Sequence, residues 1–218
     1  MKTARLAALT LALTATAAAA TLPVRAQEDG EPSAVTAEDV TAIFKIQYAS
    51  YCSTLMMGDG TPPEPKTYPL AFRYAYEDES DDLREWTLYE YECTIGAYNV
   101  GSVFYTVDEY DEIHALQFAF PEFDVVNADP EDYESEVTNV RVTGFSAREV
   151  LVFPEFDIES LELTQYSRWR GLGDASSFGR WQFRDGVFVL KTYEVDPTYD
   201  GEVNLNQIYP DNAYETGE

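Results

Sequence analysis

The chain has 218 residues, of which 40 are acidic and 14 basic, and its net charge of −26 excludes roles that need a basic surface. Such a surface repels phosphate backbones and anionic lipid headgroups, so we expect no binding to nucleic acid or to membrane surfaces. The length suits one domain or two small ones. Solubility is the simplest reason for the acidity, and capture of cations is the alternative.

The N-terminus has the pattern of a secretory signal peptide. Lys2 and Arg5 precede an Ala-, Leu- and Thr-rich stretch, and Val24-Arg25-Ala26 predicts cleavage after Ala26. A membrane anchor is the alternative, but the stretch is only weakly apolar. We therefore expect residues 1–26 to be removed and the protein to reside in the periplasm or to be secreted, without membrane insertion. Because three basic residues and no acid are lost, the net charge becomes −29.

Two cysteines, Cys52 and Cys93, remain after cleavage. In an oxidising compartment an even count predicts one disulfide. It would close a loop of about 40 residues and stabilise the fold by about 3–4 kcal/mol in the chain-entropy model. Two free thiols or a metal pair are the alternatives, but no histidine lies near either cysteine.

The sequence predicts one helix, after a polar leader at 27–35. Thr36 is a suitable N-cap, acidic residues occupy the first turn, and apolar residues recur at helical spacing over Ala37–Ser50. The apolar face expected for this helix consists of Val40, Ile43, Phe44 and Tyr51.

Beyond the loop at Gly58–Lys66 the apolar period changes from 3.6 to 2, which is typical of strands. The predicted strands are rich in aromatic and β-branched residues. They are Pro69–Tyr76, Glu85–Cys93, Ser102–Val107, Ile113–Phe120, Val137–Val142, Val150–Phe153, Leu161–Trp169, Arg180–Arg184 and Val187–Tyr193.

Asp185-Gly186 predicts a two-residue type I′ hairpin turn, because alternating strands flank it. This turn fixes the register of the two strands. Arg184 then faces Val187, Phe183 faces Phe188, and Trp181 faces Leu190, and the last two pairs would cover a buried face.

The pentapeptide FPEFD occurs twice, at Phe120–Asp124 and Phe153–Asp157. The flanks of the two copies match poorly, whereas Leu88–Tyr105 aligns better with Leu163–Trp181. We therefore expect the pentapeptide to end strands, because proline lacks an N–H donor. The better alignment predicts two similar halves, 36–127 and 137–210, related by a duplication of about 75 residues and joined by the acidic loop Ala128–Glu136.

Several segments resemble the domain of unknown function 1176 family of exported proteobacterial proteins. They are CTIGAYNVGSVFY, LQFAFPEFDV, VTGFSAREVL and the run from Ser167 to Asn204. The likeness covers about Tyr68–Tyr209 and is most specific in Cys93–Asn99 and Arg168–Gly201. Longer members carry more cysteines, and Asp174-Ala175-Ser176 stands where some of them have Cys. The resemblance implies an exported, mainly β protein and no particular chemistry.

Few catalytic patterns are present. His114 is the single histidine and is expected to be structural, so a nucleophile–histidine pair and an ordinary zinc site are not expected. No phosphate-binding Gly-Lys loop and no G-x-S-x-G motif occurs. A glycosidase needs two opposed carboxylates, and 40 acids leave a carboxylate-based hydrolase as an alternative function.

Residues Asp196–Gln207 match part of a calcium loop, with Asp196, Thr198 and Asp200 at positions one, three and five and Gly201 at six. Gln207 replaces the final glutamate and Pro197 interrupts the pattern. A calcium-binding β module is therefore a further alternative, with Asp196 and Asp200 as ligands, and an ordinary Asp-Gly turn is the simpler interpretation.

Five of the eleven basic residues that remain after cleavage lie between Arg168 and Lys191. Together with an indole and flexible glycines they suggest a site for an anionic or glycan ligand. The candidate residues are Arg168, Trp169, Arg170, Gly171, Gly173, Asp174 and Arg180. Pairing of these arginines with nearby acids is the simpler alternative.

The sequence as a whole predicts a mainly β protein with antiparallel sheets in two similar halves and one N-terminal helix. The leading hypothesis for its function is a non-catalytic role in binding or envelope maintenance. No cofactor is expected apart from the calcium alternative.

Overall fold

The computed structural model describes residues 34–57 and 60–210, and the chain from Ala34 onward forms one compact unit. The predicted signal peptide and nearly all of the polar leader lie outside the described residues. The described part is mainly antiparallel β-structure with one longer helix near its beginning, as predicted. Its helices are too short or too polar to cross a membrane.

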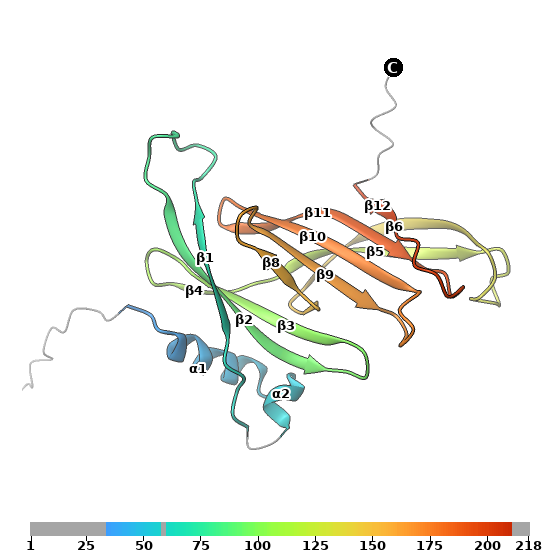
Figure 1. Ribbon diagram of the computed structural model, residues 1–218, viewed down its shortest axis with the longest axis horizontal. Coiled ribbons are helices and arrows are strands. Elements are labelled where there is room, and N and C mark those ends of the chain that lie inside the picture. Colours follow the sequence, from blue (N-terminus) through green and yellow to red (C-terminus); the bar gives the residue numbers. More distant parts are fainter. Residues whose placement is uncertain (1–33, 58–59, 211–218) are drawn as a thin grey trace, which may run out of the picture. The chain divides into compact units, whose positions relative to one another are not determined.

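The first sheet has strand order β1-β2-β3-β4 (Figure 1). A short fifth strand, β7, also pairs with β3. Side chains alternate across it, so Leu88 and Phe104 face one apolar core while Tyr89 and Tyr105 face another. This sheet is therefore buried on both faces in its middle. Its strands are β1 (Lys66–Phe72), β2 (Arg84–Ile95), β3 (Val100–Val107), β4 (Ile113–Ala115) and β7 (Leu151–Val152).

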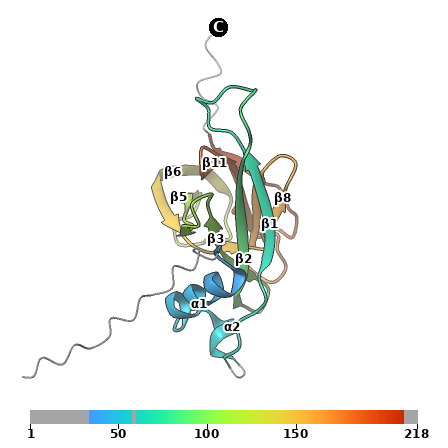
Figure 2. The same ribbon diagram turned by 90° about the vertical axis from the view of Figure 1, so that its left-hand side faces the viewer.

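Helix α1 (Ala37–Tyr48) covers one face of this sheet (Figure 2). The Thr36 side chain and Asp39 form a capping box, which confirms the predicted N-cap. Val40, Phe44 and Tyr48 are the buried positions, whereas Ile43 and Tyr51 are 39% and 56% exposed. The predicted apolar face was thus wrong at Ile43 and Tyr51, because the residues of α1 that are buried recur at every fourth position.

The disulfide between Cys52 and Cys93 is present, as predicted. It joins the chain just before the short helix α2 (Ser53–Met56) to the end of β2. Both cysteines are fully buried in the core beneath α1, so the bond fixes the helical layer to the sheet.

The second large sheet has strand order β12-β11-β10-β9-β8. Its strands are β8 (Glu155–Asp157), β9 (Glu162–Arg168), β10 (Ser176–Arg184), β11 (Val187–Asp196) and β12 (Asn206–Tyr209). The Asp185-Gly186 turn has both residues at positive φ and gives the predicted register, with Phe183 opposite Phe188 and Trp181 opposite Leu190. The two pairs are buried, so this hairpin contributes to the main core.

Strands β5 (Phe118–Asn127) and β6 (Val137–Arg148) form a separate long hairpin. The first FPEFD lies inside β5, with Pro121 opposite Phe145, so the prediction that it ends a strand was wrong. A proline is tolerated there because β5 pairs on one side alone and needs no donor on the other. The second copy does follow a strand end, since β7 stops at Val152 and Phe153 takes a left-handed φ of 42°.

The acidic loop Ala128–Glu136 is the turn of the β5–β6 hairpin. The strands predicted as Ile113–Phe120 and Val137–Val142 have different limits, because the first divides into β4 and β5 and the second runs to Arg148. Leu88–Tyr105 and Leu163–Trp181 each form a strand–loop–strand unit in a different sheet. A shared hairpin connectivity does not establish a duplication, which stays a prediction.

Candidate ligand-binding cavity

The inward face of the second sheet changes from apolar to polar along β9 and β10. Cross-strand neighbours are Leu163–Trp181, then Gln165–Gly179, then Ser167–Ser177. Gln165 and Ser177 are buried, at 3% and 4% exposure, although their positions alternate with core residues. Polar groups at inward strand positions are costly to bury unless they are hydrogen-bonded, and Gln165 is held by hydrogen bonds with the Val152 amide and the Tyr193 hydroxyl.

Gly179 permits this arrangement. A Cβ at position 179 would lie 2.4 Å from Cη2 of Trp181 and 3.0 Å from the Tyr193 ring. The Trp181 indole folds over the glycine and donates a hydrogen bond from Nε1 to the carbonyl of Ala119, 3.0 Å away. Any larger residue at position 179 would displace the indole that attaches β5 to this sheet.

The β5–β6 hairpin supplies the opposite wall. Glu122 Oε1 accepts hydrogen bonds from Ser146 Oγ at 2.5 Å and from Arg148 Nη2 at 2.7 Å. The guanidinium of Arg148 also lies 4.9 Å from the centre of the Phe120 ring. The hydrogen bonds from Ser146 and Arg148 lower the pKa of Glu122, so this wall carries one fixed pair of opposite charges.

An aromatic pair closes one end of the site. The rings of Phe123 and Trp169 are stacked, with centroids 6.0 Å apart and planes 21° apart. Asn99 forms two hydrogen bonds with the backbone of Arg168, and Tyr98 OH donates to the carbonyl of Trp169. The loop after β2 therefore fixes the backbone that carries the indole.

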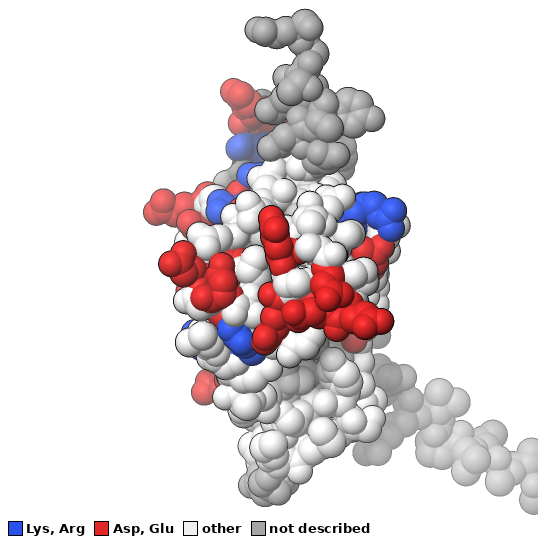
Figure 3. Space-filling view, turned by 90° about the vertical axis from the view of Figure 1, so that its right-hand side faces the viewer, with Lys and Arg blue, Asp and Glu red and all other residues white. Residues whose placement is uncertain are grey.

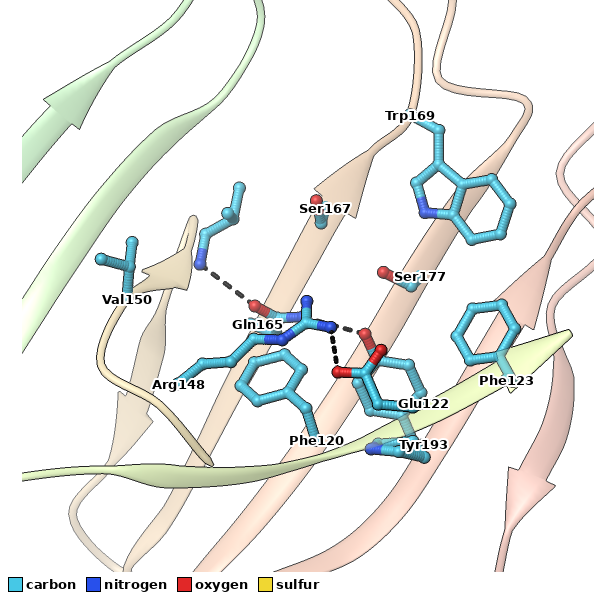
Figure 4. A pocket seen from close by; sticks show the side chains of 12 residues that line it. Phe120, Glu122, Phe123, Arg148, Val150, Gln165, Ser167, Trp169, Ser177 and Tyr193 are labelled. Atoms are coloured by element: carbon cyan, nitrogen blue, oxygen red, sulfur yellow. Dashed lines mark hydrogen bonds and ion pairs between the residues drawn. The ribbon is translucent and has the colours of Figure 1, made fainter. Parts of the chain in front are cut away.

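Together these elements enclose a cavity of about 360 Å³, here called the β5/β9 cavity (Figure 4). Its floor is polar: Gln165 Oε1 accepts from the Val152 amide at 3.2 Å, and Gln165 lies beside the buried Tyr193 hydroxyl. Burial raises the pKa of Tyr193, so its hydroxyl stays protonated. Within the described residues, the Ser167 hydroxyl and the Trp169 indole N–H have no hydrogen-bond partner.

The surroundings are strongly acidic. Figure 3 shows a face of the molecule on which acidic side chains far outnumber basic ones. The turn of the β5–β6 hairpin alone exposes Asp129, Glu131, Asp132, Glu134 and Glu136. Because Arg148 is already paired with Glu122, the cavity offers no surplus positive charge for an anion.

The structure places the predicted site residues in different environments. Trp169 is the one that lines the β5/β9 cavity. Arg170 instead forms a two-pronged ion pair with the buried carboxylate of Asp174 and donates to the carbonyl of Tyr199 at 2.9 Å. The hydrogen bonds from Arg170 hold the pKa of Asp174 well below its ordinary value. This pair joins the β9–β10 loop to the loop after β11.

The remaining candidates surround this loop. Arg180 pairs with Glu162 at 3.1 Å. Gly171 is exposed, and a Cβ added there would lie 3.7 Å from Cδ1 of Tyr98. Gly173 has a φ of +80° in the turn. Arg168 lies on the opposite face of β9 from Trp169, since side chains alternate along a strand. Their role in ligand binding stays a prediction.

The predicted calcium loop is internally hydrogen-bonded. Oδ1 of Asp196 accepts from the amide and hydroxyl of Thr198, and Oδ2 accepts from the amide of Asn204. Asp200 accepts from the amide of Glu202 at 2.9 Å. Calcium binding at these residues stays a prediction, and it would have to compete with these hydrogen bonds.

His114 is exposed, and the predicted strand Ile113–Phe120 that contains it is divided between β4 and β5. Its Nε2 lies 3.0 Å from Oδ2 of Asp108. With Glu112 these residues form one group of three potential metal ligands among the described residues. The other oxygen of Asp108 accepts from the amides of Tyr110 and Glu112, so both oxygens of this carboxylate are already hydrogen-bonded within the protein.

Sequence reasoning missed most of the cavity. Glu122, Arg148, Gln165, Ser167, Ser177 and Tyr193 were not among the predicted site residues. One signal was present: in the strand Leu161–Trp169 the inward positions read Leu, Gln, Ser and Trp, so polar residues interrupt the apolar alternation. The first FPEFD supplies four lining residues, Phe120, Pro121, Glu122 and Phe123.

The fold and the site define an antiparallel β protein with a polar and aromatic cavity between a sheet and a long hairpin. Residues 81–204 match the model of a family described as "Protein of unknown function (DUF1176)", and the chain belongs to this family. This confirms the resemblance. All residues that line the β5/β9 cavity fall within the match. Neither the curated proteins nor the solved structures contain a match to this chain.

Proposed function

We propose that this chain is an exported binding protein whose β5/β9 cavity holds a neutral saccharide unit. The observation that carries this proposal is the polar floor of Gln165, Ser167 and Ser177 at inward strand positions beside the Phe123–Trp169 pair. Binding cavities of this kind combine aromatic surface with a few convergent polar groups. A sugar ring matches both, because its faces are apolar and its edge carries hydroxyls.

The donors and acceptors of the cavity favour hydroxyl groups. Serine and tyrosine hydroxyls can both donate and accept, as a sugar hydroxyl can, and the amide of Gln165 provides both roles in one plane. The unpartnered Ser167 hydroxyl and Trp169 N–H are available to a ligand. A purely apolar ligand would leave these groups unsatisfied, at a cost of about 1–3 kcal/mol each.

Electrostatics favours a neutral ligand over an anionic one. Glu122 neutralises Arg148, the single basic residue that lines the cavity, and the whole chain is strongly acidic. An anion that pairs with Arg148 would have to displace Glu122 from its hydrogen bonds with Ser146 and Arg148. The fixed pair instead offers a donor and an acceptor on the same rim.

The same lining argues for binding in preference to hydrolysis. A two-carboxylate glycosidase requires acids on opposite sides of the ligand, one of them with a raised pKa. Glu122 is the one carboxylate that lines the cavity, and its pKa is lowered. Export is proposed on the signal-peptide pattern, and the Cys52–Cys93 disulfide is consistent with it.

Titration of the purified protein with maltose, cellobiose and chitobiose, followed by tryptophan fluorescence and calorimetry, tests the proposal. We expect saturable binding to at least one neutral sugar and loss of at least about tenfold in affinity in Trp169→Ala. Trp86→Phe is the matched control, because Trp86 lies outside the β5/β9 cavity. Equal binding by both variants, or no binding by a broad panel of neutral glycans, would refute the proposed function.

A further inference from the structure

A second cavity lies on the solvent-facing side of β9. It has a volume of about 450 Å³, and its lining includes Phe153, Glu155, Thr164, Tyr166, Arg168 and Phe178. Thr164, Tyr166 and Arg168 alternate along β9 with Gln165 and Ser167, so the two cavities lie mainly on opposite faces of the sheet, and Gln165 contributes to the lining of both. We call this second site the Phe153 cavity.

Arg168 and Arg184 differ from the other three basic residues between Arg168 and Lys191. Arg170, Arg180 and Lys191 each contact a carboxylate within 3.1 Å. Arg168 takes part in none of the ion pairs of residues 34–57 and 60–210, and its described hydrogen bonds involve its backbone alone. Of Arg168 and Arg184, Arg168 is the one that lines the Phe153 cavity, beside an aromatic ring.

The Arg168 side chain is nevertheless held in place. Its guanidinium lies 5.8 Å from the centre of the Phe153 ring, a distance at which a cation is attracted to the ring face. Its aliphatic stem lies against Gly173, where an added Cβ would be 3.2 Å from Arg168 Cδ. The cation is therefore positioned before any ligand arrives.

Phe153 shows that this geometry has a conformational cost. Its φ of 42° is in the left-handed region, which is unfavourable for a bulky residue. The amide of Phe153 donates to the carbonyl of Val100 at 2.9 Å, which holds the backbone there. The strained residue is the one whose ring contacts Arg168 and lines the cavity.

We infer that the Phe153 cavity is a second binding site, for a small carboxylate carried on a flat apolar body, with Arg168 as the anion-binding group. The guanidinium matches a carboxylate through two parallel N–H donors. The rings of Phe153, Tyr166 and Phe178 provide apolar surface for the rest of the ligand. This inference does not rest on saccharide binding, because Arg168 and the three rings are not among the residues that line the β5/β9 cavity.

The test uses phenylacetate as the probe and phenylacetamide as its neutral analogue of nearly the same shape. In ¹H–¹⁵N NMR titrations of the chain from Gln27 onward, phenylacetate should shift the amides of Tyr166, Arg168 and Phe178 in a saturable way. Loss of the charge-assisted contact should make phenylacetamide about ten- to a hundredfold weaker. Arg168→Gln should weaken phenylacetate binding equally.

Two further variants complete the design. Arg184→Gln is the matched control, because Arg184 is likewise in none of the described ion pairs but lies outside the Phe153 cavity. Phe153→Asn removes the ring, while asparagine accepts the left-handed backbone. It should lose binding and keep the spectrum of the folded protein. Equal affinity for both probes, binding that survives in Arg168→Gln, or no saturable shift in the wild type would each overturn the inference. Sugar binding that is retained in Arg168→Gln would show that a failure of the carboxylate-site inference is separate from a failure of the proposed saccharide binding.

Discussion

Ser167 provides the sharpest test of the β5/β9 cavity, because its hydroxyl faces inward and has no hydrogen-bond partner among residues 34–57 and 60–210. If the hydroxyl serves a ligand, Ser167→Ala should stabilise the free protein and weaken ligand binding at the same time. If Ser167 contributes only to packing, Ser167→Ala should leave the affinity for the ligand unchanged.

The magnitudes follow from the environment of Ser167, which is partly buried on the polar floor. Removing an unpartnered, partly buried hydroxyl should raise the free energy of unfolding by about 0.5–1 kcal/mol. In a domain of this size that corresponds to a rise of about 1–4 °C in melting temperature. Loss of one neutral hydrogen bond to the sugar should weaken its binding about two- to tenfold.

Thermal melting of the sugar-free protein and calorimetric titration with the best sugar of the panel measure the two effects. Ser167→Thr keeps the hydroxyl and should retain most of the affinity. Ser80→Ala, at an exposed loop position, should change neither quantity. A lower melting temperature combined with unchanged affinity in Ser167→Ala would refute the assignment of the polar floor to ligand binding.

Three other predictions concern the scaffold. Removing the disulfide in the double variant Cys52→Ser/Cys93→Ser should cost about 4 kcal/mol of unfolding free energy in urea, since the bond spans a sequence separation of 41; a loss below about 1 kcal/mol would contradict the chain-entropy estimate. The lowered pKa of Asp174 means that its pairing with Arg170 stabilises the fold above the ordinary Asp pKa of about 4, and that this stabilisation is lost as the pH falls through the lower folded-state value. The difference in melting temperature between wild type and Asp174→Asn should therefore shrink below about pH 4, and a constant difference would contradict the pairing. Millimolar calcium should leave the melting temperature unchanged, because both oxygens of Asp196 already accept hydrogen bonds within the loop; a clear rise would support the calcium alternative.

The local elements of this fold were predictable because their signals depend on neighbouring residues. The N-cap at Thr36, the period-two strands and the Asp185-Gly186 turn all follow from short-range sterics and hydrogen bonding, and each is present. The disulfide followed from the count of two cysteines in a chain that was predicted to be exported. The FPEFD repeat was misread because a proline is compatible with either a strand end or an unpaired strand edge, and the choice depends on strand pairing.

The candidate site required tertiary structure because its parts come from distant segments. Glu122 and Arg148 meet Gln165 and Trp169 only when the β5–β6 hairpin crosses the second sheet, an arrangement set by Trp181 and the core beneath it. Likewise, the two arginines at the end of β9 and just beyond it look alike in sequence, yet Arg170 has a buried carboxylate partner and Arg168 has none among the described residues. The sequence by itself determined the elements, the disulfide and the charge, which are local or compositional. The tertiary structure decided which polar side chains face a cavity, because long-range packing selects the face of each strand.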